Sequence, residues 1–401
     1  PLVGFILTAI VIYFLKGYFA LQYQKESPLF VEFFNYVFPL IFCVSFIAVL
    51  SVYCNANFKS TIPTYVNDVG VRLLTIAVVS LYYIKWLSFD QFITAFVCIY
   101  VIQFLILLGY IFVFDKPGFK IDWPYFREKK FMNLIGYGLL LWFASVASIG
   151  LKYFDSIILG KYMALSFVGV YTVVAFVSTI IEAPLNAFEK IASAKIAFAW
   201  QAGNMKEIDD IYHKSSLYMF LIGGFLFVNV NINIRDLLAF LPAGYSDAWH
   251  VVLILSIAAL YNMATGLNAP ILFNSDKYKY GAFFLISLAV VVVVLQNVLI
   301  PLFGLNGAAL ATALASFFYN TMLFVFVKKQ FNLMPFGKGN LRVLMLVVIL
   351  TSIGFALPSL DNKVISIAYK SMIVSGLYIL TVYKLSIAPE LHQFIPEKFR
   401  K

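Results

Sequence analysis

The stretch that decides the fold is VFPLIFCVSFIAVLSV, at residues 37–52. It carries no charge and no polar face, so a helix formed here cannot lie with one side in water. A second stretch of the same kind is VLMLVVILTSIGFAL, at residues 343–357. A helix crosses the roughly 30 Å hydrocarbon core of a bilayer with about 17 to 25 apolar residues, and irregular backbone must lie outside that core. Such uninterrupted blocks predict membrane-spanning helices.

The composition of the whole chain agrees with this prediction. Of its 401 residues, 62% are hydrophobic and only 12% are charged, whereas soluble domains contain about 45 to 50% apolar and about 25% charged residues. We therefore expect an all-α polytopic membrane protein. Twelve spans are predicted, at residues 2–15, 35–54, 71–87, 91–114, 132–154, 166–185, 215–233, 249–267, 281–300, 306–327, 342–358 and 365–386.

The start of the chain is unusual. It opens at Pro1 without a methionine or a basic flank, and the first predicted span is short. The segment has neither the charged region nor the small-residue cleavage site of a signal peptide. We expect the sequence to be truncated at its N-terminus.

The basic residues fall unevenly between the predicted loops. If the first span starts in the cytoplasm, 21 of the 29 Lys and Arg residues lie on the cytoplasmic side and 8 on the other side. Basic residues accumulate in cytoplasmic loops, so this excess predicts that both termini are cytoplasmic. The net charge of +10 is then explained by topology, and we expect no nucleic-acid partner.

Loop composition predicts how the spans are grouped. Residues 115–131 are rich in basic residues and proline, and are interpreted as a cytoplasmic linker between two lobes. The N-terminal lobe is predicted at residues 1–114 with four spans, and the C-terminal lobe at residues 132–327 with six. Residues 328–401 are predicted to form a terminal helix pair and a cytoplasmic tail. Two-lobed helical architectures are common among transporters.

One predicted cytoplasmic stretch, residues 188–216, interleaves apolar, aromatic and charged side chains. Basic and aromatic residues at the headgroup level are typical of an interfacial amphipathic helix. We therefore expect a helix lying on the membrane surface within the second lobe.

Six segments, in this order and spacing, carry a family resemblance. They are NANFKSTIPTYVNDVGVRLL from Asn55, FDSIILGKYMALSFVGVYTVVAF from Phe154, IIEAPLNAFEKIASAKIAFAW from Ile180, IYHKSSLYMF from Ile211, NAPILFNSDKYKYGAF from Asn268 and IPLFGLNGAALATALAS from Ile300. Together they resemble the oligosaccharide (Wzx-type) flippases, which are polysaccharide biosynthesis export proteins of the multidrug/oligosaccharidyl-lipid/polysaccharide (MOP, MATE-like) superfamily. The resemblance implies fourteen spans, of which this chain would contain twelve.

The resemblance also implies a function. Two six-helix lobes would surround a central cavity, with a terminal helix pair beside them, and would alternate between inward-open and outward-open states. The implied substrate is an undecaprenyl-pyrophosphate-linked oligosaccharide, such as an O-antigen, lipopolysaccharide, capsule or exopolysaccharide repeat, in the bacterial cytoplasmic (inner) membrane. Implied partners are the bilayer, a proton or sodium ion for coupling, and the polysaccharide polymerase machinery. No cofactor is implied.

Two charged residues lie together at the predicted outer end of one span. Lys152 and Asp155 are three residues apart, so they share one helix face within reach of an ion pair. Charge near the hydrocarbon is costly, which indicates either a functional cavity or a mutual pair. Lys152 is a candidate for binding substrate and Asp155 for binding a coupling ion. The alternative is a structural salt bridge, or Lys152 extending to the headgroups.

Four further residues are candidates. Glu182 precedes a proline near the inner end of its span, where its carboxyl would hold a proton or cation; an interfacial carboxylate is the alternative. Arg72 would meet a diphosphate at the cytoplasmic mouth, unless it serves as a positive-inside anchor. Asn268 offers an amide to sugar hydroxyls, although amides also join helices within membranes. Asn186, which follows Glu182 on the same span end, is a further candidate for binding substrate.

Three function classes remain to be weighed. A flippase of lipid-linked oligosaccharide is favoured, and its cavity should expose Lys and Arg to a diphosphate. A multidrug or organic-cation antiporter of the same superfamily should instead expose carboxylates and aromatic rings. A membrane glycosyltransferase or polymerase needs catalytic acids on large outer loops, and the predicted outer loops are short. We expect a transporter and not an enzyme. No cysteine or histidine spacing predicts a metal site.

Overall fold

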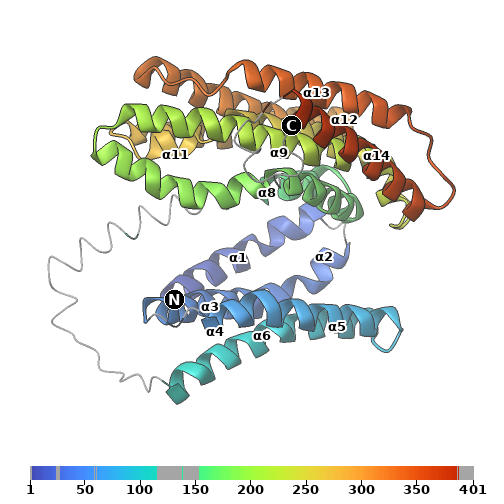
Figure 1. Cartoon of the computed structure of the whole chain (residues 1–401). Coiled ribbons are helices and arrows are strands. Elements are labelled where there is room, and N and C mark those ends of the chain that lie inside the picture. The colour runs from blue at the N-terminus through green and yellow to red at the C-terminus, as the bar shows by residue number, and fades with distance from the viewer. Residues whose placement is uncertain are drawn as a thin grey trace. The chain divides into compact units, whose positions relative to one another are not determined.

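The computed structural model places most of the chain in helices (Figure 1). It describes residues 2–23, 28–57, 59, 61–114, 138, 153–385 and 387. The described residues contain no β-strand. They divide into two compact units, Pro1–Gly138 and Leu139–Lys401. The predicted linker at residues 115–131 lies outside the described residues, and the predicted domain boundaries stay a prediction.

Four long helical segments make up the first unit. They are α1 (Leu2–Tyr23), α3 (Val37–Ala56), the run from α4 (Thr61–Thr64) through η2 (Tyr65–Gly70) to α5 (Val71–Tyr83), and α6 (Phe89–Phe114), with α2 (Pro28–Glu32) and η1 (Phe33–Tyr36) between α1 and α3. Helix α6 packs against both α3 and α5. Cys43, Ile47 and Leu107 are buried where α3 meets α6. The mostly apolar outer surfaces of these helices are suited to lipid.

Helix α1 is longer than the predicted span at residues 2–15, which was wrong at its C-terminal end. The prediction stopped at Lys16 because a charge interrupts the apolar run. In the structure the helix continues to Tyr23, and Lys16 Nζ donates to Asn35 Oδ1 at 2.9 Å. A charge ends a hydrophobic block, but a long lysine side chain with a polar partner does not end a helix.

The span predicted at residues 71–87 begins ten residues too late, because polar residues before it hid the start of the helix. The helical segment starts at Thr61. Residues 65–70 form a π-helix that leads directly into α5. Within it, Asn67 Nδ2 donates to Ser51 Oγ at 3.3 Å, and Asn67 Oδ1 accepts from Gln103 Nε2 at 2.6 Å. These polar side chains satisfy one another between helices, so a segment with Asn and Asp residues still fits among apolar helices.

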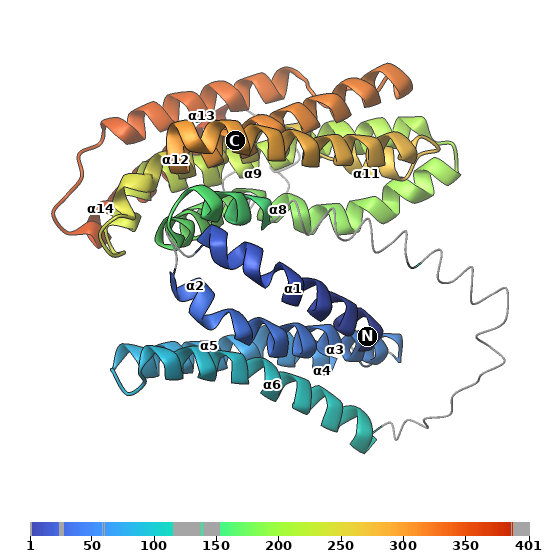
Figure 2. The same ribbon diagram turned by 180° about the vertical axis from the view of Figure 1, so that it is seen from behind.

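The second unit is built around α9. Its elements are a helix at residues 153–162, α8 (Leu165–Gln201), α9 (Met205–Leu238), η4 (Ser246–Ala248), α10 (Trp249–Thr265), α11 (Asn268–Phe273), α12 (Tyr278–Phe331), α13 (Lys338–Ala356) and α14 (Lys363–Lys384). Helix α9 packs against α8, α10, α13 and α14, and α11 lies along α12 (Figure 2). In the view of Figure 2, α9 lies behind α11 and α12, and it has buried residues along its whole length.

The prediction of a separate surface helix at residues 188–216 is wrong. Helix α8 runs without interruption to Gln201, and α9 begins at Met205, so the segment consists of two helix ends joined by a tight turn. Gly203 adopts a φ of 65° in this turn, and Asn204 Oδ1 accepts from the backbone N–H of Glu207 as an N-cap. Trp200, Ile208 and Tyr212 pack into the helical core, so their apolar side chains cover protein rather than headgroups.

Helix α12 is a hairpin of two arms. Gly304 has φ 56° and ψ −129°, a conformation that only glycine adopts without strain, and the chain reverses there. Tyr280 and Phe284 contact the ring of Phe326, which places the start of the first arm beside the end of the second. A Cβ on Gly307 would lie 2.0 Å from the carbonyl oxygen of Leu299, so the two arms approach as closely as backbones can.

The helices confirm a multi-pass membrane protein. Ten described helices are long and apolar enough to cross a membrane, and one of them is the two-armed α12. They account for eleven of the twelve predicted spans. The remaining span, predicted at residues 132–154, lies almost entirely outside the described residues.

Hydrogen bonds between polar side chains join α14 to α9. Asp236 accepts from Lys370 Nζ at 2.8 Å and from Ser366 Oγ at 2.7 Å, and all three residues are buried. Farther along, Asn233 Nδ2 donates to Ser371 Oγ at 2.8 Å, and Ser375 Oγ donates to Asn229 Oδ1 at 3.1 Å. Polar side chains that face one another are a common means of joining helices in membranes.

Candidate functional site

The second unit contains a cavity of about 490 Å³ formed by the helix at residues 153–162, α8, α10 and the second arm of α12. Its lining combines carboxylates, hydroxyls and aromatic rings: Tyr153, Asp155, Ser156, Tyr171, Thr172, Ala175, Phe176, Ser178, Thr179, Glu182, Leu255, Ala258, Ala259, Thr312 and Ser316. Two acidic residues, Asp155 and Glu182, line the same space. Ionisable groups inside membrane helices are costly and usually functional, so this cavity is the candidate site.

Asp155 lies at the centre of a hydrogen-bond network from three other helical segments. Tyr171 of α8 donates its hydroxyl to Oδ2 at 2.7 Å. Thr312, on the second arm of α12, places Oγ1 at 3.0 Å from both carboxylate oxygens. Gln296, on the first arm, donates its amide N–H to Oδ1. These hydrogen bonds join the carboxylate to three other helical segments, so the network holds this acidic group in place inside the unit.

Gln296 contributes a further feature. Its side chain is fully buried, and its amide oxygen Oε1 has no hydrogen-bond partner among the described residues. A buried acceptor without a partner costs roughly 1 to 3 kcal/mol. A half-turn of the amide group would direct Oε1 toward the Asp155 carboxylate, next to Thr312 Oγ1. A carboxylate, a hydroxyl and an amide oxygen would then face the same position. Hard cations prefer oxygen donors of these kinds.

Glu182 occupies a different depth of the cavity. It lies eleven residues after Tyr171 on α8, which corresponds to about 16 Å along the helix axis. Its Oε1 accepts from Asn262 Nδ2 of α10 at 3.0 Å. Pro184 lies inside the same helix, two residues later. The cavity therefore holds one acidic group near each end of this stretch of α8, and each is held by an amide from another helix.

None of the remaining predicted residues is among the described residues that line this cavity. Lys152 lies outside the described residues. Arg72 is exposed at the start of α5 in the first unit. Asn186 is exposed on α8, one turn beyond Glu182, and does not line the cavity. Asn268 is 2% exposed; its Oδ1 accepts from the Ala269 N–H at 2.7 Å and its Nδ2 is 3.5 Å from the Asn320 carbonyl, so its amide stabilises the start of α11.

Sequence reasoning missed three residues that contact Asp155. Tyr171 lies within a segment that carried the family resemblance, but aromatic residues are common in such segments. Gln296 interrupts a run of valines at residues 290–294 and a leucine, and a lone amide within a predicted span was a usable signal. Thr312 lies in a stretch of Gly and Ala residues, a composition typical of closely packed helices. Ala308 and Ala309 are buried in such packing, while Thr312 faces the carboxylate.

The charge of the lining is acidic. The lining residues that the structure describes include two carboxylates and no Lys, Arg or His. Among the described residues, no group of three or more His, Cys, Asp or Glu side chains is arranged to hold a metal ion. The oxygens at Asp155 and Glu182 are suited to a proton or a monovalent cation.

Known proteins resemble the chain in sequence and in fold. No protein-family model matches it. It is 26% identical over 303 residues to an uncharacterized membrane protein of Methanocaldococcus jannaschii, an alignment that covers 71% of this chain and 57% of that protein. The chain thus spans a little over half the length of this relative.

The fold match covers nearly the whole chain. A solved structure of the lipid II flippase MurJ, in an inward closed conformation, aligns with a TM-score of 0.71 and 14% identity, over 96% of this chain and 82% of that one. At this identity the likeness concerns the fold. It agrees with the predicted MOP-type architecture and does not single out the Wzx-type oligosaccharide flippases. The chain is therefore a multi-pass, all-helical membrane protein whose fold is similar to that of this flippase.

Proposed function

We propose that this chain flips a lipid-linked oligosaccharide between the two leaflets of a membrane by alternating access. The observation that carries the proposal is the fold similarity to a lipid II flippase over 96% of the chain. The proposed substrate is an oligosaccharide carried on undecaprenyl pyrophosphate, such as an O-antigen, capsule or exopolysaccharide repeat. Its diphosphate and sugars cannot cross hydrocarbon unaided, whereas its lipid tail can remain in the bilayer.

The acidic cavity of the second unit supplies a coupling site in this scheme. Asp155, with Thr312 and the amide of Gln296, would bind a proton or a sodium ion, and Glu182 would offer a second position for it. Binding neutralises a buried carboxylate and changes the hydrogen bonds that join three helical segments. A ligand shifts a conformational equilibrium only through such differential contacts, so occupation of Asp155 would bias one conformation of the unit over another.

Arg72 and Lys152 remain proposed contacts for the diphosphate, and Asn186 and Asn268 for the sugars. The burial of Asn268 favours a packing role over sugar binding. The excess of basic residues in one set of loops supports cytoplasmic termini. The bacterial inner membrane is the proposed location. A polymerase that extends the flipped repeat is a proposed partner on the outer side.

One observation favours a second candidate function. An organic-cation antiporter should expose carboxylates and aromatic rings. The described lining of the cavity has these groups and no basic residue: Asp155, Glu182, Tyr153, Tyr171 and Phe176. The two carboxylate oxygens of Asp155 already have four hydrogen-bond contacts from neighbouring side chains. This leaves little room beside them for a bulky organic cation. A small coupling ion fits that arrangement better than a drug molecule, so we favour the flippase.

A genetic experiment separates the two functions. Cells that lack the protein would be restored with wild type, with Asp155→Asn, or with Asp210→Asn as a matched control. Asp210 also loses one charge, but its side chain is 62% exposed and pairs with Lys214 on the surface. Lipid-linked oligosaccharide in each leaflet and efflux of a cationic dye would both be measured.

The flippase proposal expects lipid-linked oligosaccharide to build up in the cytoplasmic leaflet without the protein. Wild type and Asp210→Asn should relieve the build-up, and Asp155→Asn should not. If lipid-linked oligosaccharide stays at its normal level while dye efflux depends on Asp155, the antiporter is the correct function and the flippase proposal fails.

A further inference from the structure

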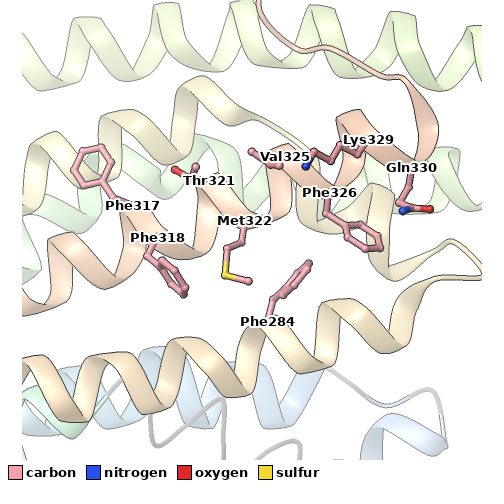
Figure 3. Close-up of a pocket in the computed structure, with 9 residues that line it drawn as sticks. All are labelled: Phe284, Phe317, Phe318, Thr321, Met322, Val325, Phe326, Lys329 and Gln330. Carbon is pink, nitrogen blue, oxygen red and sulfur yellow. The ribbon is translucent and has the colours of Figure 1, made fainter.

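A second concave feature lies away from the acidic cavity. It is a groove of about 540 Å³ along the two arms of α12 (Figure 3). Phe284 reaches into it from the first arm, and the opposite wall comes from the second arm between Phe317 and Gln330. The helices that form it belong to one hairpin, so the groove is a property of the second unit alone.

The wall of the groove is apolar and partly aromatic. Phe284 and Phe326 pack edge to face with ring centroids 5.4 Å apart, and Met322 lies beside them. Phe318 is 44% exposed. The hydroxyl of Thr321, the polar group midway along the wall, is engaged by Tyr261 at 2.9 Å. A flexible hydrocarbon chain suits such a surface, because it satisfies apolar contacts and requires no hydrogen bonds.

One end of the groove is cationic. Lys329 and Gln330 line this mouth, and both are exposed. Tyr280 contacts Phe326, so the start of α12 lies at the same end of the groove as Lys329. The other charged residues at the start of the first arm and the end of the second arm are Asp276, Lys277, Lys279 and Lys328. In the part of the chain that the structure describes, no carboxylate pairs with Lys329. The mouth therefore carries four lysines against one aspartate.

The depth of the groove corresponds to one leaflet. Phe317 and Lys329 are twelve residues apart on one helix, which is about 18 Å. Half of a hydrocarbon core of roughly 30 Å is about 15 Å. An acyl chain that starts at the headgroup level of Lys329 would therefore end near Phe317, at the middle of the bilayer.

We propose that this groove binds an anionic phospholipid, with one acyl chain along the aromatic wall and the headgroup phosphate at Lys329 and Gln330. Basic pockets between membrane helices recognise anionic headgroups by the same chemistry. The lipid would brace the two arms of α12, which present Gln296 and Thr312 to Asp155. The site would thus make the proposed transport sensitive to membrane composition.

The lipid-linked substrate fits this groove less well. A diphosphate carries more charge than a phosphodiester and calls for several cations that converge on it, whereas Lys329 is the one cation among the described residues that line the groove. A polyprenyl carrier is also much longer than one leaflet is deep. We therefore assign the groove to a membrane phospholipid.

Native mass spectrometry of the detergent-purified full chain tests the assignment. Phosphatidylglycerol and phosphatidylcholine with identical acyl chains would be titrated against wild type, Lys329→Ala and Lys328→Ala. The two lysines are neighbours in the last helical turn and carry the same charge, but only Lys329 lines the groove. A third variant, Met322→Trp, would fill the groove and leave its charge unchanged. The temperature at which half of the protein is lost from its size-exclusion peak would be measured for each variant to confirm that it folds.

We expect wild type to prefer phosphatidylglycerol, and Lys329→Ala to weaken that binding about fivefold while Lys328→Ala changes it by less than about twofold. Met322→Trp should weaken binding of both lipids. Equal binding of the two lipids by wild type, or equal losses in the two lysine variants, would overturn the proposal. Displacement of phosphatidylglycerol by undecaprenyl phosphate at lower concentration would also overturn it, in favour of the transported lipid. None of these binding results depends on transport activity.

Discussion

Replacing Lys370 with alanine should destabilise the protein far more than replacing Lys363, although both lysines contact the same carboxylate. Lys370 Nζ lies 2.8 Å from Asp236 Oδ2, and the two side chains are 5% and 4% exposed. Lys363 Nζ lies 3.5 Å from the other oxygen, and its side chain is 39% exposed. The two substitutions remove the same charge and differ in burial.

The magnitude follows from that difference. Removing one partner of a buried pair leaves an uncompensated charge and costs about 3 to 5 kcal/mol. An exposed pair contributes about 0 to 1 kcal/mol, because water screens it. Lys370 also donates to Ser359 Oγ at 2.7 Å, a bond that is lost in the same variant. We therefore expect Lys370→Ala to cost at least about 3 kcal/mol, and Lys363→Ala at most about 1 kcal/mol.

The free energy of unfolding can be measured by titrating sodium dodecyl sulfate into mixed micelles. A double variant, Asp236→Leu with Lys370→Met, serves as a control and should be more stable than Lys370→Ala alone, because no buried charge remains unpaired. The reasoning is wrong if Lys363→Ala costs as much as Lys370→Ala, or if both stay within about 1 kcal/mol of wild type.

Other predictions follow from single contacts. Gly307→Ala should destabilise the α12 hairpin by about 1 to 3 kcal/mol, because its Cβ would lie 2.0 Å from the Leu299 carbonyl oxygen. Gly169→Ala, with no atom within 4 Å of the new Cβ, should instead stabilise α8 by roughly 0.5 to 1 kcal/mol in the same titration; equal effects would refute the close approach. Thr312→Val removes a hydroxyl 3.0 Å from both Asp155 oxygens, so the coupling-ion concentration for half-maximal transport should change by about tenfold or more; an unchanged value would exclude Thr312 from the ion site.

The fold was largely predictable because lipid imposes a simple rule on sequence. Uninterrupted apolar blocks located all the spans that the described residues can test. The ends of helices were less predictable, since apolarity marks the hydrocarbon and not the helix. Lys16 lies within α1, and residues 188–201 continue α8 beyond the predicted span. Both errors arose where a helix extends past its apolar block.

The candidate site was only partly predictable. Asp155 and Glu182 could be singled out because carboxylates are rare in such helices. Their shared cavity depends on how the helix at residues 153–162 packs against α8, which no local pattern encodes. Asn268 illustrates the converse. An amide just beyond a predicted span suggested a sugar ligand, but this amide contacts the Ala269 N–H and the Asn320 carbonyl. Amides that bind ligands and amides that join helices look alike in sequence.

The measurement that tests the central proposal most directly is flipping by the purified protein in liposomes. A lipid-linked oligosaccharide with a fluorescent sugar would be added to proteoliposomes, and its exposure in the outer leaflet followed with a membrane-impermeant quencher. The proposal predicts that wild type moves the lipid between leaflets, that an ion gradient changes the rate, and that Asp155→Asn abolishes this response while Asp210→Asn retains it. If liposomes with wild-type protein exchange the lipid no faster than protein-free liposomes, under proton and sodium gradients alike, the flippase proposal is contradicted.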